Sequence, residues 1–236
     1  MSQVSIIALG GSLMYTDSEI NETWLMSVSE AIYKSATSEN KIGIVIGGGW
    51  LARNSIEKAK KSGLTDTYDL DLIGIDSTRK NAELFRTKLE NMGADVNERI
   101  PTTIEDAAQL LESHSIVIMG GTVPGHTTDT VSISLAVESG SDNCTIVTNV
   151  DFVYDQAPQN NPDAIPFEIM NLSQLQAIVG PPEHKGAGPN VVIDPIGVQV
   201  AIEQEISLSL LNGNKIENLS NRLSGKPFLG TIIEVD

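Results

Sequence analysis

Short apolar runs alternate along this chain with longer segments whose apolar residues recur at the spacing of one helix face. The apolar runs predict strands at Val4–Leu9, Lys41–Ile46, Ile116–Met119, Thr145–Val150, Ser207–Leu211 and Thr231–Val235. The periodic segments predict helices at Glu19–Ser38, Leu51–Lys61, Thr67–Met92, Ile104–Glu112, Asp129–Glu138, Leu172–Val179, Pro195–Glu203 and Ile216–Leu223. This alternation is typical of an α/β fold with a mainly parallel sheet that helices cover on both faces.

One long segment has neither pattern. Tyr154–Pro166 contains three prolines and several Asn and Asp residues, so we expect it to be a loop.

Glycine clusters follow three of the predicted strands. They are Gly10-Gly11-Ser12, Gly47-Gly48-Gly49 and Gly120-Gly121-Thr122. In open parallel sheets, ligands bind beyond the carboxyl ends of the strands, where backbone N–H groups and helix N-termini face the ligand. One glycine pair is more often a tight turn, but three such loops should meet at one edge of the sheet. The sequence therefore predicts an anion-binding site at that edge.

The charge of the chain narrows the choice of partner. The 236 residues carry a formal net charge of −16, and no lysine or arginine occurs between residues 100 and 184. Nucleic acids are bound by clustered basic residues, so we expect no nucleic-acid partner. An anion held by the second half of the chain must be bound mainly by N–H groups, hydroxyls, helix dipoles or a metal ion.

Cysteine content and apolar run lengths favour a cytoplasmic protein. Cys144 is the single cysteine, which fits a reducing compartment and a small buried side chain. The first residues, MSQVSIIALGGSL, have no positively charged segment, so we expect a first strand and no secretory signal. No apolar run approaches the roughly 18 residues that span a bilayer, so we expect no membrane partner.

Several common catalytic signatures are missing. The chain contains no GxxxxGK[ST] phosphate loop, no GxGxxG in a first βα unit and no GxSxG elbow. The three histidines, His114, His126 and His184, lack metal-ligand spacing, so no protein metal site is expected.

Six segments, in this order, resemble the amino acid kinase superfamily, and within it the archaeal-type uridylate (UMP) kinases. They are VSIIALGGSLM, IVIGGGWLAR, LDLIGIDSTRKNAEL, IMGGTVPGHTTDTVSISLAVE, TNVDFVY and NVVIDPIGVQVA. GGTVPGHTTD is the most specific of them, and the resemblance covers nearly the whole chain. It implies a three-layer αβα sandwich in one domain, with an acceptor (UMP) lobe at 1–142 and an ATP lobe at 143–236. It also implies ATP-dependent phosphorylation of UMP with Mg²⁺, and a homohexamer built as a trimer of dimers.

The resemblance also assigns residues to roles. Catalysis would depend on Gly11, Ser12, Arg53 and Asp129. UMP would be bound by Gly48, Asp71, Thr122, Pro124, Gly125, His126, Thr127 and Thr128. ATP would be bound by Gly11, Ser12, Gly49, Arg53, Thr148, Asn149 and Tyr154, with Asp151 as a weaker candidate. Taken alone, Asp71 is more typical of a helix-cap carboxylate, and Asp129 is also suited to cap the helix that it begins.

The ATP half of the pattern departs from the family. Phe152 and Ala157 stand where the family has a glycine and an aspartate, and Trp50 replaces a small or basic residue. Ala8 occupies the position of a superfamily lysine, which archaeal uridylate kinases often lack too. A catalytically weak or inactive nucleotide- or oxyanion-binding relative therefore stays open, as does a kinase for another small phosphate such as isopentenyl phosphate.

Overall fold

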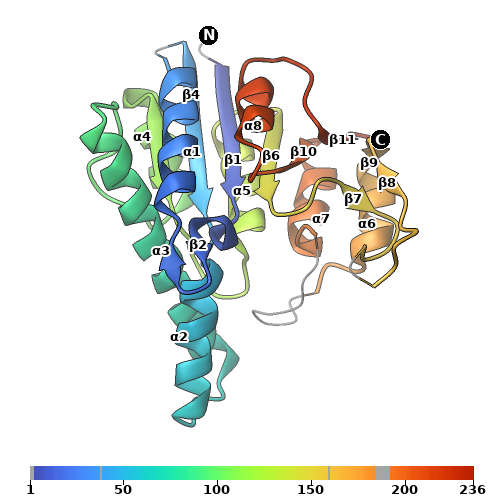
Figure 1. Cartoon of the computed structure of the whole chain (residues 1–236), viewed down its shortest axis with the longest axis horizontal. Helices are drawn as coiled ribbons and strands as arrows, with labels where there is room; N and C mark the ends of the chain where they lie inside the picture. Colours follow the sequence, from blue (N-terminus) through green and yellow to red (C-terminus); the bar gives the residue numbers. More distant parts are fainter. Residues whose placement is uncertain (1–2, 38, 159, 184–191) are drawn as a thin grey trace.

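A seven-stranded sheet forms the centre of the molecule (Figure 1). The computed structural model describes residues 3–37, 39–158, 160–183 and 192–236. In spatial order the strands are β5 (Ile116–Met119), β4 (Asn40–Ile46), β1 (Gln3–Leu9), β6 (Asn143–Thr148), β10 (Ser207–Asn212), β11 (Gly230–Glu234) and β9 (Ile169–Asn171). All neighbours are parallel except β10 and β11. The mainly parallel sheet predicted from the sequence is confirmed.

The order of the strands fixes where a ligand can lie. β1 pairs with β4 on one side and β6 on the other, and Leu9 is level with Ile46 and Val147. After β1 the chain adds β4 and β5 on one side of it and then β6 and β10 on the other, so the strand order switches next to β1. Open α/β sheets bind ligands at such a switch point. The same pairing makes one continuous sheet from the two halves of the chain.

Two apolar layers cover the two faces of the sheet. α1 (Glu22–Ser35), α3 (Thr67–Asn91) and α8 (Ile216–Leu223) pack on one face, against residues that include Ile7 and Leu9. α4 (Ile104–Ser113), α5 (Thr128–Glu138), α6 (Leu172–Val179) and α7 (Pro195–Glu203) pack on the other, against residues that include Ile6 and Ala8. Successive β1 side chains thus enter opposite cores, as the alternation of a strand requires. α2 (Gly49–Lys61) packs along α3 and extends beyond the sheet (Figure 1).

The first predicted helix begins later than its apolar pattern indicated. Glu19–Ile20 is the strand β3, which pairs with β2 (Tyr15–Thr16) after a 3₁₀ turn at Gly11–Met14. α1 then begins at Glu22, because the Asn21 side chain accepts a hydrogen bond from the Trp24 amide at 3.1 Å and caps the helix. The helix ends at Ser35, and Ser38 lies outside the described residues.

The predicted loop at Tyr154–Pro166 is closed by a short hairpin. Its two ends belong to β7 (Val153–Tyr154) and β8 (Pro166–Phe167), which pair antiparallel. These two-residue strands are too short for apolar alternation to mark them, and the same holds for the three-residue strand β9. In the described part of the chain, no helix has the length and apolar character needed to cross a membrane.

Candidate active site

The first two glycine loops touch at the carboxyl end of the sheet. A Cβ atom added at Gly11 would collide with the Gly47 carbonyl and with the Gly49 amide nitrogen, and one at Gly49 would collide with the Gly11 carbonyl. Gly49 also has a φ of +55°, a conformation that side chains disfavour. Glycine is required at these two positions because two backbones meet there. The predicted convergence of these loops is confirmed.

Gly48 and Gly49 open α2 and leave its first amide groups without side-chain caps. Within the described residues, no protein group accepts a hydrogen bond from the Gly48 or Gly49 amide. A helix start of this kind attracts an anion through its N–H groups and its dipole. Arg53 lies one turn into the same helix, is exposed, and pairs with no carboxylate of the described chain.

The third glycine loop rests on α3. The Gly121 amide donates to the Thr78 hydroxyl at 2.6 Å. The Arg79 guanidinium donates to the carbonyl oxygens of Gly121 and Thr122, both at 3.0 Å. Arg79 therefore uses these hydrogen bonds to hold the loop in its conformation. The Oγ1 atom of Thr122 is buried and has no partner in the described structure.

Asp71, also on α3, binds a later part of the same loop. Its carboxylate accepts a hydrogen bond from the Gly125 amide at 2.9 Å. It does not cap α3, because the Asp66 side chain performs that role by accepting from the Asp69 amide. The helix-cap interpretation of Asp71 is wrong, and its carboxylate lies beside the Thr122–Thr128 segment.

A carboxylate from α7 holds the other end of the loop. Asp194 is 6% exposed, and its Oδ2 accepts hydrogen bonds from the Thr127 and Thr130 hydroxyls, each at 2.6 Å. Its Oδ1 accepts from the Ile196 amide at 3.2 Å and so caps α7. The α5 and α7 N-termini are thus joined by one buried carboxylate.

Asp129 lies next to this network. Its Oδ2 accepts from the Asp194 amide at 3.3 Å, whereas Thr127 caps α5, so Asp129 is not the cap. Burial and, to a smaller extent, the negative charge of Asp194 together raise the pKa of Asp129 to about 6. A carboxyl with a pKa near neutrality at the edge of a ligand site is typical of a functional group.

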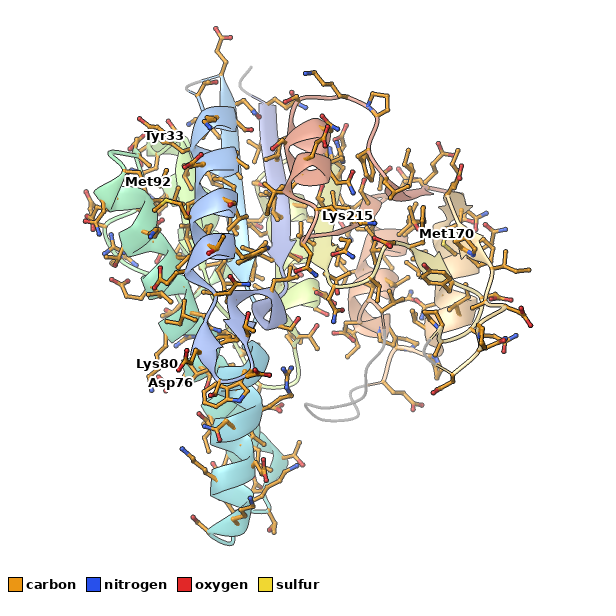
Figure 2. All side chains as sticks on the ribbon, in the orientation of Figure 1. Tyr33, Asp76, Lys80, Met92, Met170 and Lys215 are labelled. Atoms are coloured by element: carbon orange, nitrogen blue, oxygen red, sulfur yellow. The ribbon has the colours of Figure 1, made fainter. Side chains whose placement is uncertain are left out.

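The ATP side of the predicted site lies at the ends of β6 and β10. Thr148 ends β6 and accepts from the Gly213 amide at 2.7 Å, and Asn149 is exposed beside it. Asp151 accepts a hydrogen bond at 2.7 Å from Lys215, the residue labelled in Figure 2, and this lowers the pKa of the Asp151 carboxyl. Its carboxylate is therefore occupied by a lysine.

The aromatic residues beyond β6 pack against each other. The rings of Phe152 and Tyr154 meet edge to face, with centroids 6.3 Å apart, and both side chains are partly buried. Ala157 is exposed in the loop that follows. Phe152 thus packs against Tyr154, the residue assigned to ATP.

Metal ligands are sparse in the described structure. No group of three or more His, Cys, Asp or Glu side chains gathers anywhere in those residues. Mg²⁺ prefers oxygen ligands and commonly keeps several waters while it binds substrate phosphates. The donor set therefore fits Mg²⁺ only as an ion carried by nucleotide phosphates.

The matched family agrees with this arrangement. The model of the amino acid kinase family matches residues 3–212. This chain belongs to the amino acid kinase family. Uridylate kinase from Thermoplasma volcanium is 36% identical over 234 residues, which cover 99% of each chain. Uridylate kinase from Archaeoglobus fulgidus is 32% identical over 228 residues, 97% of this chain and 98% of its own.

Solved structures give the same picture. The crystal structure of uridylate kinase from Archaeoglobus fulgidus matches with a TM-score of 0.83 and 31% identity, and covers 99% of this chain and 100% of its own. UMP kinase from Bacillus anthracis matches with a TM-score of 0.82 at 22% identity, which supports the fold alone. The three-layer αβα sandwich of the amino acid kinase family is confirmed.

Sequence reasoning missed four residues that hold the loops of the candidate site. They are Thr78, Arg79, Asn81 and Asp194, all in segments that carry the family resemblance. Three of them lie within the run STRKN of α3. The available signal was this polar run on a helix face that otherwise carries apolar residues. Buried polar side chains need hydrogen-bond partners, so the run indicated contacts with another segment.

Proposed function

We propose that this protein transfers the γ-phosphoryl group of ATP to UMP and releases UDP and ADP. The observation that carries this proposal is the loop from Gly120 to Thr128, which α3 holds through Asp71, Thr78 and Arg79. A loop fixed at this edge of the sheet presents hydroxyls and amides to a nucleotide beside the anion-binding start of α2. The uridylate kinases named above are similar over their full length, and their activity supports the same acceptor.

In this proposal the acceptor is bound by the first half of the chain, residues 1–142. The Asp71 carboxylate would accept hydrogen bonds from the UMP ribose, and Thr122, Pro124, Gly125 and His126 would surround the base. The hydroxyls and amides of Thr127 and Thr128, at the start of α5, would face the UMP phosphate together with Gly48.

The transfer step needs alignment and charge stabilisation more than covalent chemistry. A UMP phosphate oxygen forms a bond to the γ-phosphorus as the bond from that phosphorus to the β–γ bridging oxygen breaks. The backbone N–H groups of Gly11, Ser12 and Gly49 would donate hydrogen bonds to the transferred phosphoryl group. The Arg53 guanidinium would balance its negative charge. Asp129, ionised above its pKa, would orient the groups around it, since its Oδ2 already accepts from the Asp194 amide.

The second half of the chain, residues 143–236, would hold ATP through Thr148, Asn149 and Tyr154. Mg²⁺ would enter bound to the nucleotide and supply charge neutralisation of its phosphates. We further propose a cytoplasmic protein that assembles as a homohexamer, a trimer of dimers, which light scattering on the purified protein would measure.

A coupled assay that follows ADP release tests the function. With ATP and Mg²⁺, we expect turnover on UMP and little on CMP, dTMP or isopentenyl phosphate. Preference for isopentenyl phosphate would overturn the choice of acceptor.

The partly buried Phe152–Tyr154 pair and the exposed Ala157 favour one second candidate, a nucleotide-binding relative with weak or no catalysis. That candidate predicts UMP binding by calorimetry without turnover. UMP binding accompanied by turnover excludes it.

A further inference from the structure

Asn81 on α3 lies directly behind the glycine loop that opens α2. Its side chain is 1% exposed, and its Nδ2 donates to the carbonyl oxygens of Gly47 and Gly48 at 2.9 and 3.1 Å. An amide nitrogen can donate twice and accept nothing, so these two carbonyls fix which way the side-chain amide points. Its Oδ1 must then face a donor.

Two carbonyls held in this way also fix two amides. A peptide group is planar and trans, so its C=O and N–H bonds point in opposite directions. With the Gly47 and Gly48 carbonyls turned back to Asn81, the N–H groups of Gly48 and Gly49 turn away from it. These are the amides that no described protein group accepts from. The Gly48 carbonyl also accepts from the Ala52 amide of α2 at 3.1 Å, whereas Asn81 is the one described residue that donates to the Gly47 carbonyl. Asn81 therefore sets the direction of the Gly48 amide and reinforces that of the Gly49 amide, and both face the ligand side of the loop.

The donor that Asn81 requires comes from Tyr15. The Tyr15 hydroxyl donates to Asn81 Oδ1 at 2.6 Å. Burial raises the pKa of Tyr15, which keeps that hydroxyl protonated. Tyr15 belongs to β2, one residue beyond the 3₁₀ turn that begins at Gly11, and its ring lies 5.8 Å from that of Trp50. Tyr15 thus directly follows the turn that begins at Gly11, and its ring packs against Trp50, the residue after Gly49.

We infer that Tyr15 is a positioning residue, which acts through Asn81 to hold the Gly48 and Gly49 amides toward a bound phosphate. The inference rests on the proposed function, because the phosphate in question belongs to UMP or to the group transferred to it. Removing the Tyr15 hydroxyl leaves Asn81 Oδ1 buried without its donor, and its side-chain amide is then free to rotate away from the two carbonyls. The loop then loses its preset orientation while the surrounding helices keep their packing.

The test compares Tyr15→Phe with the wild type and with Tyr33→Phe as a matched control. Tyr33 is 43% exposed on α1 and lies at the far end of that helix from the β2–β3 hairpin (Figure 2). We expect Tyr15→Phe to lower kcat/KM for UMP by about three- to tenfold, the size of one lost neutral hydrogen bond. The inhibition constant of uridine, which has no phosphate, should stay the same. Tyr33→Phe should change neither value.

The outcomes separate the inference from the function. If the wild type turns over UMP and Tyr15→Phe loses UMP efficiency and uridine affinity equally, Tyr15 has a general structural role and the inference is overturned. Unchanged kcat/KM in Tyr15→Phe overturns it as well, and the proposed function stands in both cases. If the wild type does not phosphorylate UMP at all, the proposed function fails first and the inference falls with it.

Discussion

Replacing Asp129 by asparagine should stabilise the protein while it strongly lowers the turnover rate. The pKa of Asp129 is raised from 3.8 to about 6 by burial and by the adjacent Asp194. A carboxyl whose pKa is higher in the folded protein contributes stability below its unfolded pKa, and that contribution is lost as the pH rises through 6. The difference between the two pKa values corresponds to about 3 kcal/mol at neutral pH. Asparagine keeps the shape and an acceptor for the Asp194 amide but carries no charge.

Urea unfolding at several pH values measures this effect. Between pH 5 and pH 8 the wild type should lose about 1.4 kcal/mol that Asp129→Asn does not lose, since Asp129 releases its proton over that range. At pH 8 the variant should be the more stable protein, by up to about 3 kcal/mol. Asp163→Asn, at an exposed carboxylate, controls for the loss of one negative charge.

The activity of the same variant completes the test. If Asp129 orients the transferred group, kcat should fall by about a hundredfold or more. Stability gained together with activity lost is the signature of a strained functional group. A variant that is less stable than the wild type at pH 8, by an amount that does not change with pH, would refute the reasoning.

Three further changes test the rest of the site. Arg53→Ala should cost about 2–4 kcal/mol in transition-state stabilisation without loss of fold, and unchanged kinetics would remove Arg53 from the site. Asp71→Asn should raise the KM for UMP far more than that for ATP, whereas equal effects would indicate a structural contact. Phe152→Gly combined with Ala157→Asp should tighten ATP binding, because a restored carboxylate acceptor is worth about 1–3 kcal/mol if partly buried, and should leave UMP affinity nearly unchanged. Calorimetry that finds ATP bound at least as tightly as UMP by the wild type would contradict this last expectation.

The sequence predicted the helices well and the two- and three-residue strands poorly. α6, α7 and α8 have the bounds that their apolar spacing indicated, because each buries one face against the sheet. The β2–β3 hairpin was missed, since two-residue strands are set by hydrogen bonds to neighbours and not by burial. The capping effect of Asn21 then moved the start of α1 beyond the residues that share its apolar pattern.

For the site, the glycines could be predicted and their supports could not. Gly11 and Gly49 can be recognised in the sequence as glycines after strands, and only glycine permits two backbones to approach so closely. Asn81 and Asp194 are recognisable only once their partners, at Gly47 and Thr127, are brought next to them by the fold. Those contacts join residues more than 30 positions apart, and local patterns carry no record of them. Which roles the glycines and their neighbours play in turnover stays a prediction until the variants are measured.

The segment between β5 and α5 is anchored at both ends to different layers of the sandwich. α3, on one face of the sheet, holds its first part through Thr78 and Arg79, and α7, on the other face, holds Thr127 through Asp194. For an engineer who wishes to exchange acceptors between relatives, residues 120–128 are therefore not an interchangeable cassette. If these residues were grafted alone, the new protein would lack the anchoring side chains of Thr78, Arg79 and Asp194. The transferable unit is the segment together with its anchors, and natural variation in one should be accompanied by variation in the other.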